Sequence, residues 1–191
     1  MDWKRSFLES FILGQSTNKT DANAVQSKCV DLAYRDMMTA GRFYSNSFLH
    51  SKDEICSSVI ELIKSNDYKF SRDMIKTTAS KICNDTIGTG NRFVTGYGLA
   101  QKITNMTFKY LYVFSDLIFT DGKVPDFSSC DCPLDSIILG KASLDGYTWS
   151  KLKIDEYKRC QEEIAQLLEK NPPNDVELTK LGNMAFDLIS W

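Results

Sequence analysis

Helical spacing of the apolar residues is the feature that most constrains the fold of this chain. Apolar residues recur three or four positions apart through most of the 191 residues, and no run of β-type alternation is long enough for a convincing strand. This pattern predicts an all-α fold, a single compact domain over residues 1–191 with about eight helices. We expect helices near residues 2–13, 20–40, 52–65, 70–84, 97–119, 134–141, 153–169 and 175–190.

Two of these helix starts carry capping signals. Ser51 precedes Glu54 by three positions, the spacing of a capping box in which each side chain satisfies an orphan backbone N–H. Asn174 and Glu177 repeat that spacing after a Pro-Pro pair, which ends the preceding helix.

Two loops bracket the long helix expected at 97–119. Residues 86–96 hold three of the ten glycines, and residues 120–133 hold two of the four prolines. Both compositions favour turns over helix. The chain has no internal repeat and no low-complexity linker, so we expect one folding unit.

The charge balance limits the partners of the chain. With 23 basic and 25 acidic residues the formal charge is −2, so a nucleic-acid binder of this composition needs a local basic patch. No apolar run approaches the 18 or so residues that span a bilayer, and the first residues lack the apolar core of a signal peptide. We therefore expect no membrane association and a cytoplasmic location.

The cysteines do not have metal-site spacing. Six are present, but Cys130 and Cys132 form only C-x-C, and His50 is the one histidine. Structural zinc sites use C-x-x-C pairs or paired histidines. We expect no metal site and no cofactor, with most of these cysteines buried as small apolar side chains.

A polar stripe on the helix expected at 97–119 is the first candidate for chemistry. Lys102, Asn105, Lys109, Tyr112 and Asp116 are spaced by three and four positions, so they lie along one side of a helix. Such a stripe can act together on a ligand. It can equally be a solvated helix face.

Glycines precede this stripe and an acidic helix start follows it. Gly96 and Gly98 lie where the helix begins, and a glycine turn there exposes backbone N–H groups that can hold a phosphate. Further along, Pro133 and Asp135 open the next expected helix, whose dipole favours a charged carboxylate. Without a ligand, Pro and Asp at this place are simply a good helix start.

In this order the segment resembles the helix-hairpin-helix DNA glycosylases. That superfamily has a glycine hairpin, a helix, a loop and then a Pro-Val-Asp element that opens another helix. By this resemblance Asp135 matches the catalytic carboxylate and Pro133 the proline before it, while Gly96 and Gly98 match the phosphate-binding hairpin. The segment also resembles a set of small bacterial helical proteins with A-Q-K, N, K-Y and C-P-x-D elements, and this resemblance implies no chemistry.

The resemblance implies two alternatives for the catalytic amine. Members with lyase activity carry a Schiff-base lysine just after the second glycine, where this chain has Ala100 and Gln101. Lys102 lies four residues after Gly98, and Lys109 lies deeper in the helix, closest to the arrangement of the archaeal 8-oxoguanine glycosylases. An amine nucleophile must be partly neutral, which requires a desolvated site beside an acid.

Two hypotheses for function follow. In the first the chain binds DNA and cleaves the N-glycosidic bond of a modified base, with Asp135, Lys109 and Lys102 as catalytic candidates. Its candidate substrate contacts are Gln101, Asn105, Tyr112, Gly96, Gly98 and Arg92, and its candidate stacking aromatics include Phe93, Tyr97, Phe127 and Trp149.

In the second hypothesis the chain is a non-enzymatic helical protein that binds a protein partner, in a phage or defence setting. The two hypotheses differ in what they predict for the structure. The enzyme requires Lys109 and Asp135 in one pocket with Asn105 nearby and a cationic rim. The interaction protein has these side chains diverging and an exposed apolar patch elsewhere.

Overall fold

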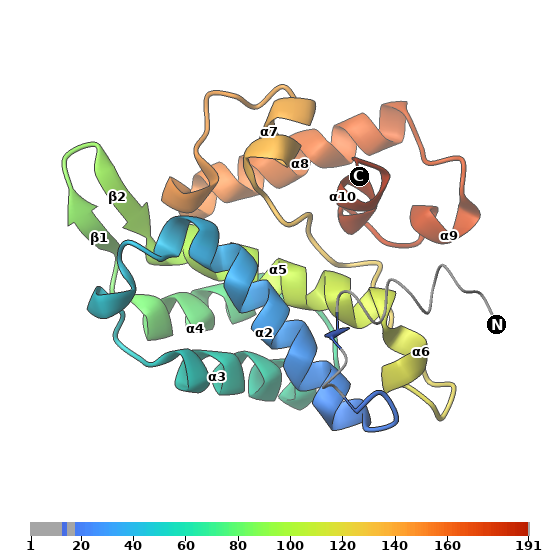
Figure 1. The fold of residues 1–191 in the computed structure, drawn as a ribbon. Coiled ribbons are helices and arrows are strands. Elements are labelled where there is room, and N and C mark those ends of the chain that lie inside the picture. Colours follow the sequence, from blue (N-terminus) through green and yellow to red (C-terminus); the bar gives the residue numbers. More distant parts are fainter. Residues whose placement is uncertain (1–12, 15–17, 191) are drawn as a thin grey trace.

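Helix α5, Gly96–Val113, runs through the centre of the structure, a computed structural model that describes residues 13–14 and 18–190 (Figure 1). Thirteen of the 18 residues of α5 are buried. Packing on all sides buries its polar residues too, and buried polar groups need hydrogen-bond partners. The expected helix at 2–13 lies outside the described residues except for Leu13.

On one side of α5, two helices pack directly on it and a third packs on those two. The helices α2 (Ala22–Gly41) and α4 (Arg72–Ile82) contact α5, and α3 (Lys52–Ser65) contacts α2 and α4. The predicted capping box at the start of α3 is confirmed: Ser51 accepts from the Glu54 backbone N–H, and the Glu54 carboxylate accepts from the Ser51 N–H at 2.8 Å.

The C-terminal third of the chain covers the other side of α5 (Figure 1). It contains α7 (Ser136–Lys141), η2 (Trp149–Lys151), α8 (Ile154–Lys170), α9 (Val176–Thr179) and α10 (Met184–Ser190). The helix expected at 175–190 is therefore split. Gly182 lies between the two parts with φ +56°, a left-handed conformation that ends regular helix. The cap of α9 is Asp175, one residue after the predicted Asn174.

The fold is mostly helical but not purely all-α, because residues expected to be a loop form a β-hairpin. Strands β1 (Thr86–Thr89) and β2 (Arg92–Thr95) pair antiparallel, with Thr89 opposite Arg92. A two-residue Gly-Asn turn joins them, and Gly90 has φ +57°, as tight hairpins require. β-Branched residues on both sides of this turn favour strand over loop.

The long helix expected at 97–119 also ends early. Phe114 leaves helical geometry (φ −106°, ψ 21°), although its side chain is buried, and the short helix α6 (Ser115–Ile118) follows. All six cysteines are free thiols, and five of them are buried. Across the described residues no cluster of His, Cys, Asp and Glu has the arrangement of a metal site, and no helix has the length and apolarity needed to cross a membrane.

Close packing at the start of α5 yields a prediction for stability. A Cβ on Gly98 lies 2.7 Å from the carbonyl carbon and oxygen of Ser150, so Gly98→Ala must push η2 away from α5. We expect a loss of about 1–3 kcal/mol in the free energy of unfolding measured with urea. Gly146→Ala is the matched control, since a Cβ there meets nothing within 4 Å. Equal stability of the two variants contradicts the packing described.

Candidate functional site

A buried irregular segment, residues 130–135, lies against α5 and α8 and is held there by two glutamine side chains. Gln101 of α5 accepts from the Leu134 N–H at 3.1 Å and donates to the Leu134 carbonyl at 3.0 Å. Gln161 of α8 does the same for Cys132, at 3.0 and 2.7 Å. Both glutamines are fully buried. Side-chain amides thus satisfy the backbone of a segment that belongs to no helix or sheet.

A second buried network fixes the start of this segment. The Arg72 guanidinium binds both oxygens of Asp131, at 2.6 and 2.9 Å. The Tyr157 hydroxyl donates to Asp131 at 2.9 Å and accepts from the Asn105 amide at 2.8 Å. Burial and the Asp131 carboxylate raise the pKa of Tyr157 well above its usual value, so the phenol keeps its proton and donates it. Helices α4, α5 and α8 are all tied to the segment.

The segment ends at a cleft of about 470 Å³. Its walls come from α2, α5, η2, α10 and the start of α7. The polar and aromatic residues that matter for chemistry are Lys102, Lys109, Tyr110, Asp135, Trp149 and Asp187. The size is within the range of small-molecule sites, about 300–1,000 Å³.

Asp135 combines a structural and an electrostatic role at the edge of this cleft. One carboxylate oxygen caps α7 by accepting from the Ile138 N–H at 2.8 Å, and the other accepts from Lys102 Nζ at 2.9 Å. Burial acts to raise the pKa of Asp135, but the Lys102 cation and the backbone donors outweigh it and lower the pKa below 3.8. Asp135 is therefore a carboxylate at neutral pH.

A second lysine–aspartate pair lies on the same cleft. Lys109, about two helical turns after Lys102, forms an ion pair with Asp187 of α10, whose side chain is 1% exposed. Beside it the Tyr110 hydroxyl donates to Asp36 of α2 at 2.8 Å. The cleft thus holds two amines, Lys102 and Lys109, and three carboxylates, Asp36, Asp135 and Asp187.

Residues of the predicted polar stripe face two different environments, the cleft and the buried 130–135 segment. Lys109 and Asp135 line the same cleft, as the enzyme hypothesis requires, and Lys102 lines it too. The cationic rim that this hypothesis also requires is not found among the lining residues, where three aspartates outnumber two lysines. Asn105 and Gln101 instead face the 130–135 segment and are occupied there. They are positioning residues in this arrangement, and the substrate contacts expected of them are not available.

Two further candidates are placed away from the cleft. Tyr112 packs edge-on against Phe127, with ring centroids 5.6 Å apart. Arg92 is exposed on β2, where it lines a separate groove with Phe43 and Tyr44. Neither belongs to the lining of the cleft.

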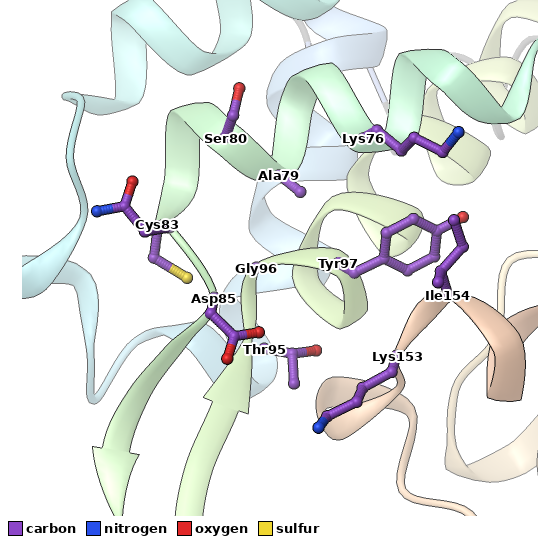
Figure 2. Close-up of a pocket in the computed structure, with 11 residues that line it drawn as sticks. Lys76, Ala79, Ser80, Cys83, Asp85, Thr95, Gly96, Tyr97, Lys153 and Ile154 are labelled. Carbon is purple, nitrogen blue, oxygen red and sulfur yellow. The ribbon is translucent and has the colours of Figure 1, made fainter.

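The amides assigned to phosphate binding are used inside the protein. Gly96 N–H donates to the Asp85 carbonyl at 2.8 Å, and Gly98 N–H donates to Thr95 Oγ1 at 2.9 Å. Figure 2 shows Gly96 in the wall of another cavity, of about 380 Å³, beside Cys83 and Tyr97. These glycines allow close packing of α5 on its neighbours, and this replaces the phosphate-binding role expected from the sequence.

Two acids of the cleft, Asp187 and Asp36, were not predicted as functional residues. The sequence does indicate a special role for Asp187, because this acid interrupts an apolar helix face and a buried acid requires a partner. Asp36 gives no such signal, because it lies on the border of an exposed face of α2.

Comparisons of the chain with protein-family models, with curated proteins and with solved structures found no match in any of the three. The glycosylase resemblance stays a prediction from sequence motifs.

The environment of Asp135 gives a titration prediction. A carbon-detected NMR titration of the wild-type carboxyl should give a midpoint below 3.8, and Lys102→Met should move this midpoint upward because burial then acts without the cation. With a pKa depressed in the folded state, this carboxylate contributes stability above its unfolded pKa, and the contribution is lost as the pH falls through the folded value. A wild-type midpoint at or above 3.8 rejects this description of the site.

Proposed function

We propose that the chain cleaves the N-glycosidic bond of a modified or damaged base in DNA, with the cleft as the site of reaction. One observation carries the proposal: Lys102, Lys109 and Asp135, which the sequence motifs single out, line the same cleft. The alternative of an interaction protein predicts an apolar patch. Among the described residues the large exposed apolar side chains are spread over several elements, from Phe43 on one side to Ile189 in α10.

The chemistry of the bond suits a buried carboxylate. As the base leaves, positive charge develops on the sugar, and a fixed anion beside the sugar stabilises it. A carboxylate can also take a proton from an attacking water. Asp135 has the required charge, is mostly buried and is held by its cap on α7. It supports either role.

The two amines support different roles. Lys102 donates to Asp135 itself, so it orients the carboxylate and balances its charge. Lys109 has the Asp187 carboxylate beside it, an acceptor for the proton that an amine must lose before it attacks a sugar carbon. We therefore assign any Schiff base to Lys109 and the positioning of Asp135 to Lys102.

Trp149 supplies an apolar wall for the base. Its side chain is 9% exposed and lines the cleft next to the lysine–aspartate pairs. A base taken out of the helix loses stacking worth a few kcal/mol, and an aromatic surface offsets part of this loss. Among the aromatics predicted for stacking, Trp149 is the one that lines this cleft.

The test is turnover on a panel of DNA duplexes that each carry one modified or damaged base. Asp135→Asn is the main variant, since asparagine keeps the helix cap but lacks the charge. On any duplex that wild type processes, Asp135→Asn and Lys109→Gln should each lower the rate about 100-fold or more. Lys52→Gln, which breaks the Lys52–Asp31 pair outside the cleft, should leave the rate unchanged.

Two results contradict the proposal. One is no turnover by wild type on any duplex, and the other is full activity in Asp135→Asn. Borohydride trapping then separates the amines: a covalent adduct that survives Lys102→Gln and disappears in Lys109→Gln supports the assignment of Lys109. An adduct with the opposite dependence reverses the two roles.

A further inference from the structure

One face of the molecule, next to the cleft, combines exposed aromatic rings with cations. Phe43, just after α2, is 76% exposed, and the Arg42 guanidinium lies over its ring at 4.7 Å. On the hairpin, Lys151 of η2 lies over the ring of Phe93 at 4.8 Å. A groove of about 620 Å³, which we call the hairpin groove, is lined by Phe43, Tyr44, Gly88, Thr89 and Arg92.

The hairpin groove is built by specific contacts. Gly88 has φ +101°, and a Cβ there comes within 2.9 Å of the Tyr44 ring, so only glycine lets β1 approach this ring. On the other side Lys151 Nζ donates to the Asn91 carbonyl at 2.8 Å and ties the hairpin turn to η2. The hairpin is thereby held at a fixed position beside the end of α2.

The face has a charge opposite to that of the whole chain. The formal charge of the protein is −2, yet the residues that line the hairpin groove include Arg92 and no aspartate or glutamate. Arg42 lies over the ring of Phe43, and Lys151 bonds to the hairpin turn. The local basic patch that a nucleic-acid binder of this composition needs is therefore present here.

Two elements contribute residues both to the cleft and to the surroundings of the hairpin groove. Thr39 of α2 lines the cleft, and Arg42 follows within one helical turn. Trp149 of η2 lines the cleft, and Lys151 ends the same short helix. Figure 1 shows the C-terminal end of α2 beside the hairpin. A polymer bound in the groove can therefore reach the cleft.

We propose that the hairpin groove binds the DNA strand that flanks the nucleotide in the cleft, a choice of polymer that rests on the proposed function. Phe43 stacks on an unpaired base, and Arg92 and Lys151 contact phosphates. Exposed aromatics beside cations are the combination that proteins use for single-stranded nucleic acid, where rings stack on bases and cations track the backbone. An acidic peptide satisfies the cations but leaves the exposed ring without a partner.

The test is fluorescence anisotropy of the full chain with a labelled single-stranded oligonucleotide of about 12 nucleotides. Phe43→Ala and Arg92→Gln should each weaken binding about fivefold or more. Arg92→Gln should also reduce the slope of log affinity against log salt by about 0.7, the value for one lost phosphate contact. Val176→Ala and Lys158→Gln, exposed positions on α9 and α8, are the matched controls and should bind like wild type.

Three results overturn this inference: wild type that does not bind the oligonucleotide, groove variants that bind as the controls do, or polyglutamate that competes as well as unlabelled oligonucleotide. An Asp135→Asn background separates this inference from the proposed function: Asp135 lies in the cleft and not in the groove, so Phe43→Ala and Arg92→Gln should weaken binding by the same factor in this background as in wild type. If binding depends on the groove residues but no duplex is processed, the glycosylase proposal is rejected and the groove proposal is supported. If turnover depends on Asp135 but Phe43→Ala and Arg92→Gln do not affect binding, the groove proposal is rejected and the glycosylase proposal is supported.

Discussion

The hydrogen bonds between two glutamine amides and the backbone of the 130–135 segment are the constraint on which the rest of this structure depends. Cys130 and Asp135 at the ends of this segment make backbone hydrogen bonds, but Cys132 and Leu134 bond to side chains, and each unpaired buried group costs about 1–3 kcal/mol. Gln101 and Gln161 supply a donor and an acceptor to one residue each. The segment can therefore pass between α5 and α8 and deliver Asp135 to the cleft.

This constraint explains why the central helix is rich in polar residues although it is buried. Gln101 and Asn105 face the segment, while Lys102 and Lys109 face the cleft. The same helix thus positions the acid from one side and supplies its counter-charge from the other. A substitution that disturbs the glutamine bonds should alter the cleft without touching any residue that lines it.

Local signals in the sequence predicted much of the fold. The helices α2, α3 and α8 follow from apolar spacing, and the start of α3 from a capping box. The glycine content of residues 86–96 predicts a loop, but the Gly-Asn turn between β-branched residues favours the hairpin that is found. The break at Phe114 has no local signal of glycine or proline.

The candidate site was predictable only in part. Helical spacing placed Lys102 and Lys109 together, and the helix start identified Asp135. The ion pair between Lys102 and Asp135 joins residues 33 positions apart, and no local sequence pattern specifies such a pair. The same spacing grouped Asn105 with the lysines. A polar stripe in the sequence does not show that Asn105 faces the 130–135 segment while Lys102 and Lys109 face the cleft. The glycines at the start of α5 were assigned to phosphate because sequence does not show which amides are already bonded.

Native-state hydrogen exchange of the Cys132 and Leu134 amides tests the central constraint most directly. Exchange from a hydrogen-bonded, buried amide requires opening of the structure, and for a segment pinned between two helices this opening approaches global unfolding. The account predicts that both amides are protected nearly as strongly as the core of α5, and far more strongly than the amide of Asn91 in the hairpin turn. Exchange of Cys132 and Leu134 as fast as Asn91 contradicts it, because the segment is then not held by Gln101 and Gln161.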